Sequence, residues 1–195
     1  LLPLFVNSLS KKYPDLQVEI IEMGVKEMVL GLENEELDGG IAIYPFDKAG
    51  FYEEVLFDEK FVIYISLDHP LAAKKEISWN DISPEDLILQ EDLHNHFLSP
   101  DHSEQSKFIA GKISNIHFLS GSFETIRKII ELHGGMTLLP QLSTIYMGAR
   151  RLKMVRPLIH PTISRKIILV TPRGFEKNRI TKVIKKEILK NLPSQ

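Results

Sequence analysis

Short amphipathic helices alternate with short apolar strands over the first 46 residues, and this alternation constrains the fold more than any other feature. LLPLFVNSLSKKYP has helical apolar spacing that ends at Pro14, and LQVEIIEM (16–23) has the composition of a strand. VKEMVLGLENEEL (25–37) returns to helical spacing, and DGGIAIYPF (38–46) predicts a short strand after a Gly-Gly turn. Such alternation is typical of an α/β domain with parallel strands.

Two longer predicted strands follow, and a second region of helices and strands comes after them. FYEEVLF (51–57) and KFVIYISL (60–67) have strand composition and are predicted to be joined by a turn at Asp58-Glu59. SFETIRKIIELH (122–133) predicts a strongly amphipathic helix, and GGMTLLP (134–140) predicts a buried strand after a glycine helix stop. The remaining predicted elements are strands at 88–90, 113–120, 151–158 and 163–172 and helices at 103–112, 141–148 and 175–192.

This order of elements predicts two α/β lobes. The strands at 60–67 and 163–171 are the two places where we expect the chain to cross between the lobes, because no Gly/Ser linker is present. The predicted domains are therefore lobe I, residues 1–67 and 169–195, and lobe II, residues 68–168. Two-lobed α/β proteins bind small molecules in the groove between the lobes, at strand ends and helix N-termini.

Composition excludes several classes of function. The 195 residues carry a formal net charge of −2, so the chain as a whole has no preference for a polyanion. Cysteine is absent, which excludes disulfide frameworks, thiolate metal sites and cysteine nucleophiles. No apolar run approaches the roughly 18 residues of a membrane helix, and the start lacks the pattern of a signal peptide. We therefore expect a cytoplasmic protein with no membrane association.

Three histidines, His94, His96 and His102, lie close together in the stretch LILQEDLHNHFLSPDH. Two imidazoles at H-x-H spacing lie on the same side only in a strand, whereas Pro100 and the polar neighbours indicate a loop. The stretch could also line a binding pocket or hold a catalytic base. We expect no metal ion here, and a pocket-lining loop is the favoured interpretation.

Other chemical motifs are weak. Ser122 stands at a predicted helix start, where a serine commonly caps backbone N–H groups, although the same N-terminus can also bind an anion. No G-x-S-x-G is present, and neither Gly39-Gly40 nor Gly134-Gly135 fits a phosphate-binding loop, so we expect no cofactor. The basic stretches ARRLKMVR (149–156) and KVIKKEILK (182–190) are interpreted as solvated surfaces.

Five segments, taken together and in order, resemble the effector-binding domain of LysR-type transcriptional regulators. They are LLPLFVNSLSKKYPDLQVEIIE, LENEELDGGIAI, EEVLFDEKFVIYISLDHPLA, ILQEDLHNHF and SFETIRKIIELHGGMTLLPQLS. The resemblance implies two Rossmann-like lobes with a periplasmic-binding-protein-like (type 2) architecture, joined by two crossing strands, with an effector cleft between them. It also implies that promoter DNA is bound by an N-terminal winged helix-turn-helix, which this sequence does not contain.

Within the family, ILQEDLHNHF is similar to the E-[DE]-G-H-C motif of peroxide-sensing, OxyR-like regulators. Glu91, Asp92 and His94 match this motif, Leu93 replaces its glycine, and Asn95 replaces the reactive cysteine. The resemblance therefore implies an OxyR-like scaffold without the redox cysteines.

Two more positions of the OxyR pattern are also changed. The resolving cysteine would fall near Glu104 or Lys107, and a pocket-lining threonine corresponds to Val25. Family members also have a central strand before the first helix. Without it, 16–23 and 38–46 would lack a shared neighbour, so we expect upstream sequence or another chain to supply that strand.

The resulting prediction is a small-molecule-sensing domain of a LysR-type regulator that is not an enzyme. A free-standing solute-binding protein of the same fold is one alternative, and an enzyme with His94 as general base is another. We expect a homodimer or tetramer, in which Phe5, Leu9 and Ile20 meet the Ile126–Ile130 helix face of a partner. The predicted effector-binding residues are Gly24, Val25, His94, Asn95, Ser120 and Ser122.

Overall fold

The chain forms two compact units. The computed structural model describes residues 1–46, 48–89, 122–160, 162–174 and 178–193. Leu1–Glu59 and Arg165–Gln195 make up unit 1, and Lys60–Ser164 makes up unit 2. Two strands, β2 (Phe51–Ile65) and β6 (Ser164–Pro172), each contain residues of both units. The units divide after residues 59 and 164, whereas the sequence predicted lobe boundaries after residues 67 and 168.

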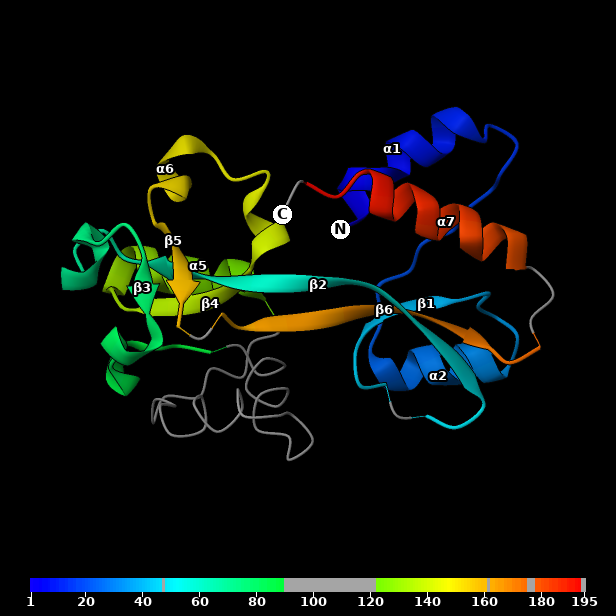
Figure 1. Cartoon of the computed structure of the whole chain (residues 1–195), viewed down its shortest axis with the longest axis horizontal. Helices are drawn as coiled ribbons and strands as arrows, with labels where there is room; N and C mark the ends of the chain where they lie inside the picture. Colours follow the sequence, from blue (N-terminus) through cyan, green and yellow to red (C-terminus); the bar gives the residue numbers. More distant parts are fainter. Residues whose placement is uncertain (47, 90–121, 161, 175–177, 194–195) are drawn as a thin grey trace. The chain divides into compact units, whose positions relative to one another are not determined.

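Unit 1 contains helices α1, α2 and α7 around the strand pair β1–β6 (Figure 1). Strand β1 (Gly40–Ile43) pairs antiparallel with β6, with Gly40 opposite Val170 and Ile43 opposite Ile167. The helices are α1 (Leu2–Lys12), α2 (Val25–Glu33) and α7 (Asn178–Lys190), close to the predicted ranges.

Strand β6 is buried on both faces because its side chains alternate between two cores. Ile167 and Leu169 pack with Phe5 and Leu9 of α1 and with Ile188 of α7. Ile168 and Val170 point the other way and pack with Met28 and Leu32 of α2. The run of four consecutive apolar residues, without polar alternation, is the sequence pattern of such a two-sided strand.

The strand predicted at 16–23 is not formed. The segment has no pairing partner among the described residues, and Val18, Ile20, Ile21 and Met23 are 39–54% exposed. β-branched residues favour a strand only where a neighbouring strand accepts their backbone hydrogen bonds. By contrast, β1 does form, because β6 is its partner.

The turn predicted at Asp58-Glu59 is also wrong, because β2 runs without interruption from Phe51 to Ile65. Strand β6 is the neighbour of β2 in the sheet, and two of its basic residues pair with these two acids. Arg165 contacts the Glu59 carboxylate at 2.7 Å through Nη2, and Lys166 contacts Asp58 at 3.1 Å. Asp58 and Glu59, which predicted a turn from the sequence, therefore lie inside a strand because each has a basic partner on β6.

Unit 2 is built on the second half of β2. This part of β2 pairs antiparallel with β4 (Met136–Pro140) and with β5 (Val155–Ile159), and β3 (Ile77–Ser78) pairs parallel with β5. Parallel pairing, which the alternating pattern predicted, is thus a minority among the described strand pairs. The helical elements are α5 (Phe123–His133), α6 (Ala149–Leu152) and the short 3₁₀ segments Pro70–Ala73, Trp79–Asp81, Pro84–Asp86 and Gln141–Thr144.

The side chains of β2 separate two cores in unit 2. Phe61, Ile63 and Ile65 contribute to one core together with Trp79, whereas Tyr64 lies in the other with Ile126. Helix α5 covers this second core, as its predicted amphipathic pattern required. At its end, Gly134 and Gly135 have φ of 89° and 88°, a backbone conformation that favours glycine, and the chain then enters β4.

Candidate functional site

Two of the predicted site positions lie at the N-terminus of α2 in unit 1. Gly24 is the N-cap residue, and its carbonyl accepts a hydrogen bond from the Met28 N–H at 3.0 Å. A side chain at Gly24 would require the carboxylate end of Glu27, in the first turn, to move. Val25 is 53% exposed. Because Glu27 already supplies negative charge to this helix end, we expect the surface there to contact a neutral or donating part of a ligand, such as an amide N–H, and not its anionic group.

A third predicted position, Ser122, lies at the N-terminus of α5 in unit 2. Ser122 occupies the N-cap position, and its carbonyl accepts from the Ile126 N–H at 3.3 Å. Its hydroxyl makes no capping hydrogen bond to the helix, so the prediction that this side chain caps α5 is wrong. The first turn of α5 therefore lacks the side-chain acceptor that a capping serine would supply.

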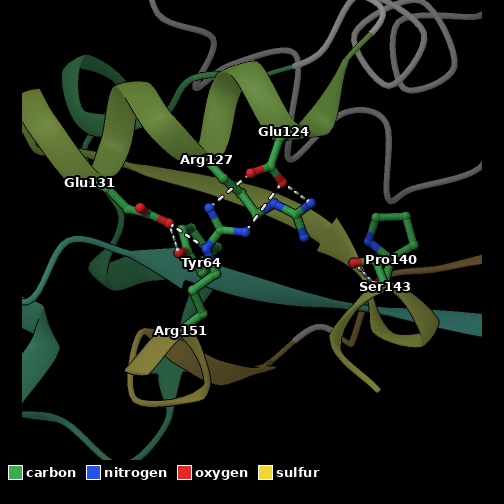
Figure 2. A network of polar contacts seen from close by, with 7 residues as sticks. All are labelled: Tyr64, Glu124, Arg127, Glu131, Pro140, Ser143 and Arg151. Carbon is green, nitrogen blue, oxygen red and sulfur yellow. Dashed lines mark hydrogen bonds and ion pairs between the residues drawn. The ribbon is translucent and has the colours of Figure 1, made fainter. Parts of the chain in front are cut away.

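A network of charged side chains holds the start of α5 (Figure 2). Arg151 of α6 donates two hydrogen bonds to Glu124, from Nη2 to Oε1 at 2.8 Å and from Nη1 to Oε2 at 3.3 Å. Arg127, one turn further along α5, also pairs with Glu124. These guanidinium contacts, that of Arg151 first, hold the pKa of Glu124 below its ordinary value.

The same Arg151 reaches a second carboxylate two turns along the helix. Its Nε donates to Glu131 at 2.8 Å, and the hydroxyl of Tyr64 donates to the same oxygen at 2.6 Å. The Tyr64 hydrogen bond is the main cause that lowers the pKa of Glu131. Burial first, and then Glu131, raises the pKa of Tyr64, so its phenol stays protonated and acts as a donor at neutral pH.

Arg127 is the least satisfied member of the network. Its side chain is 16% exposed, and its Nε atom is buried without a hydrogen-bond partner among the described residues. Nearby, Ser143 donates to the Pro140 carbonyl at 2.7 Å and fixes the turn that follows β4 (Figure 2). The network thus fixes the first turns of α5 while leaving one buried donor beside Glu124.

Three predicted site residues cannot be placed. His94, Asn95 and Ser120 lie outside the described residues, as do His96 and His102. Within the described ranges, no group of three His, Asp or Glu side chains could hold a metal ion. The N-terminus of α2 belongs to unit 1 and the N-terminus of α5 belongs to unit 2. Each is therefore described as a separate local site.

Sequence reasoning missed the charged network. The stretch 149–156 was interpreted as a solvated surface, but Arg151 joins the network and the guanidinium of Arg156 binds backbone carbonyls. A usable signal existed, since Glu124, Arg127 and Glu131 have the spacing of one helix face. Arg156 donates to the carbonyls of Ala72, Lys74, Lys153 and Val155.

The predicted dimer contact is wrong in most of its residues. Phe5 and Leu9 are 3% and 4% exposed because they pack inside unit 1, and Ile126 and Ile130 are fully buried inside unit 2. Their helical periodicity reflects the core of their own unit. Of the residues predicted to form the contact, Ile20 is the one that the structure leaves exposed, at 44%.

Two α/β units, with β2 and β6 each containing residues of both, are the architecture of the two-lobed, periplasmic-binding-protein-like (type 2) class. The family model described as "LysR substrate binding domain" matches residues 1–192, and the chain belongs to this family. No helix in the described part of the chain is long and apolar enough to cross a membrane.

The relatives found by comparison include peroxide regulators. The chain is 29% identical over 184 residues to the hydrogen peroxide-inducible genes activator of Haemophilus influenzae, covering 94% of this chain and 60% of that protein. It is 31% identical over 174 residues to the DNA-binding transcriptional dual regulator OxyR of Escherichia coli K12, covering 89% and 56%. The chain therefore spans little more than half the length of these curated relatives.

Solved structures agree on the fold. The crystal structure of OxyR from Porphyromonas gingivalis matches with a TM-score of 0.84 at 21% identity, over 99% of this chain and 87% of that one. A crystal structure of the reduced form of OxyR matches with a TM-score of 0.79 at 27% identity, over 98% and 88%. The predicted fold class and the OxyR-like resemblance are confirmed, and the chain lacks cysteine altogether.

Proposed function

We propose that this chain is the small-molecule-sensing regulatory domain of a LysR-type transcriptional regulator that acts in the cytoplasm. The observation that carries the proposal is the family match over residues 1–192, in the order and spacing of the whole domain. This match favours a regulator over a free-standing solute-binding protein and over an enzyme. DNA binding would belong to a part of the parent protein outside this sequence, as the length of the relatives suggests.

The effector site includes the N-terminus of α5. The backbone N–H groups of its first turn favour a negatively charged or amide-bearing ligand. Gly24 and Val25 at the start of α2, and His94, Asn95 and Ser120 in the part of the sequence outside the described residues, complete the proposed set. The side chains of Arg127 and Arg151 hold Glu124 and so limit its repulsion of an anion.

Effector binding would change the regulator's affinity for its promoter only if the ligand binds one arrangement of the protein more tightly than another. A homodimer or tetramer is the assembly in which such a change would be transmitted. The segment around Ile20, which is exposed, could contribute to that assembly, whereas the buried faces of α1 and α5 could not.

A thermal-shift screen of the chain against anionic and amide-bearing metabolites tests the proposed site. A ligand at 100 times its Kd stabilises a protein by about 2.7 kcal/mol, which raises Tm by about 5–10 °C for a chain of this size. We expect Ser122→Ala to reduce this shift and the matched change Ser10→Ala, at an exposed serine of α1, to leave it unchanged. A ligand whose shift is the same in wild type and Ser122→Ala would show that Ser122 is not part of the site.

A further inference from the structure

The outward face of α7 carries a row of positive charges. Arg179, Lys182, Lys186 and Lys190 are exposed, and their spacing of three, four and four residues places them on one side of the helix. In Figure 1 this helix lies beside α1 on unit 1. The row is therefore a continuous cationic surface and not a scatter of unrelated lysines.

Two acidic residues that the structure describes at α7, Glu187 and Glu54, are engaged in contacts away from this row of cations. Glu187 is fully buried and faces α1, where it accepts a hydrogen bond from Ser8 at 3.0 Å and pairs with Lys12. Lys185, on a different side of α7, pairs with Glu54 at 2.6 Å. These contacts attach α7 to its own unit and leave its outer face to the cations.

Few compensating charges for this row are found in the described part of the chain. Among the residues that the structure describes, no ion pair joins Arg179, Lys182 or Lys186 to a carboxylate. The hydrogen bond from Lys12 is the main cause that lowers the pKa of Glu187, and the charge of Lys190 adds only a small contribution. The whole chain has a net charge of −2, so this concentration of cations is not a consequence of a basic composition.

The positions of these cations are unfavourable for the helix itself. Arg179 and Lys182 lie in or next to the first turn, where the helix dipole disfavours positive charge, and the first turn contains no acidic residue. Lys182 and Lys186, and then Lys186 and Lys190, are like charges four residues apart, which destabilise a helix. Only the cations of the last turn, such as Lys190, are favourable for helix stability. Because this row of cations lowers the stability of its own helix, we infer that it serves to bind a partner outside the chain.

We propose that this face of α7 contacts the phosphate backbone of duplex DNA when the regulator is bound at its promoter. The proposal rests on the proposed function, because it needs a parent protein that brings this domain close to DNA. From Arg179 to Lys190 the row spans twelve residues, or about 16 Å of helix, which matches the rise of about five base pairs. Lysine and arginine bind phosphate without reading sequence, so the contact would add affinity and position without adding specificity.

Fluorescence anisotropy of a labelled 20-base-pair duplex of arbitrary sequence tests this contact directly. The chain should bind weakly at about 20 mM salt and lose binding by about 200 mM, with a slope of log K against log salt near −3 for three to four phosphate contacts. Lys182→Glu/Lys186→Glu should weaken binding at least tenfold. The milder Lys182→Gln/Lys186→Gln should reduce the slope by about 2, with an unchanged circular dichroism spectrum.

A matched control separates the α7 face from net charge. Lys75→Glu/Lys153→Glu makes the same charge change at two exposed lysines of unit 2 and should weaken binding less than threefold. Equal loss in both double variants, no duplex binding at 20 mM salt, or binding of poly-glutamate in place of duplex DNA would each overturn the proposal. The metabolite-induced thermal shift should be the same in Lys182→Gln/Lys186→Gln as in wild type, so a failure of the effector proposal is recognised separately.

Discussion

At the scale of single residues, Arg151 pairs with two carboxylates of unit 2, Glu124 and Glu131. It connects α6 to Glu124 and Glu131, two positions of α5 that are two turns apart, and Glu131 in turn accepts from the buried Tyr64. A planar guanidinium can serve both carboxylates at once, whereas a lysine presents a single point charge. Arg151 therefore helps to position α5, together with the buried Ile126 and Ile130 of that helix.

We predict that Arg151→Ala lowers the free energy of unfolding by about 2 kcal/mol, because it removes hydrogen bonds between charged groups that are partly screened by solvent. Arg151→Lys should recover less than half of this loss. Urea unfolding at pH 7 measures both changes. The control is Arg150→Ala, at the exposed neighbouring residue. Its free energy of unfolding should stay within about 0.5 kcal/mol of that of wild type.

The effect of Arg151→Ala should depend on pH in a defined direction. The pKa values of Glu124 and Glu131 are lowered from 4.5 in the folded protein. Their stabilising contribution is therefore complete above about pH 4.5 and is lost as the pH falls through the folded values. The difference between wild type and Arg151→Ala should therefore shrink as the pH falls below about 4.5, and a constant difference would contradict the assigned role of the carboxylates.

For single residues, the sequence correctly predicted which side chains lie on an apolar face, but it did not predict which residues those side chains contact. The spacing of Phe5 and Leu9 correctly placed both on an apolar face, but the sequence could not say whether that face meets its own unit or a second chain. For Ser122, the sequence identified the N-cap position but not whether its hydroxyl caps the helix. The capping hydrogen bond depends on the side-chain rotamer, which the sequence does not determine.

At the scale of elements, the continuity of β2 depends on the acidic residues at its centre. Glu59 is 5% exposed and receives two hydrogen-bonding nitrogens of Arg165, whereas Asp58 and Lys166 are both about half exposed. Composition rules read Asp58-Glu59 as a turn because isolated acids are disfavoured in strands. Only the neighbouring strand, more than a hundred positions away, shows that both acids have basic partners.

We predict that Glu59→Ala lowers the free energy of unfolding by about 3 kcal/mol, since it leaves the largely buried Arg165 without this carboxylate. Asp58→Ala, the adjacent change on the same strand, should cost less than about 0.5 kcal/mol, because its ion pair is solvent-exposed. Urea unfolding with a native-state fluorescence probe measures both. Similar losses in the two variants would mean that burial of Glu59 does not determine its contribution.

The segment 16–23 shows the limit of strand prediction. Its Val and Ile residues have strand composition, yet the four apolar residues are exposed and the segment has no partner strand among the described residues. The helices α1, α2, α5 and α7 were predicted well because each makes its backbone hydrogen bonds internally. A strand needs a neighbour, which its own sequence does not supply.

At the scale of the whole molecule, the chain resembles peroxide-responsive regulators but lacks the residues that thiol-based peroxide sensing needs. Relatives of this chain are named as hydrogen peroxide-inducible activators, but the chain has no cysteine. Thiol-based peroxide sensing needs a thiolate that attacks peroxide and a second thiol that traps the oxidised sulfur as a disulfide. The fold can therefore be inherited without the redox reaction, because packing and thiol chemistry depend on different residues.

We predict that peroxide at low concentration produces no reversible switch in this chain. Methionine is its only sulfur-containing residue; Met136, Met154 and Met28 are buried, and Met23 is 39% exposed. Oxidation should therefore begin slowly at Met23, where a sulfoxide cannot form a disulfide. Near-UV circular dichroism and sedimentation should show an unchanged fold and assembly after mild peroxide, while mass spectrometry reports any added oxygen at Met23. A rapid change that thioredoxin or glutathione reverses would contradict this prediction.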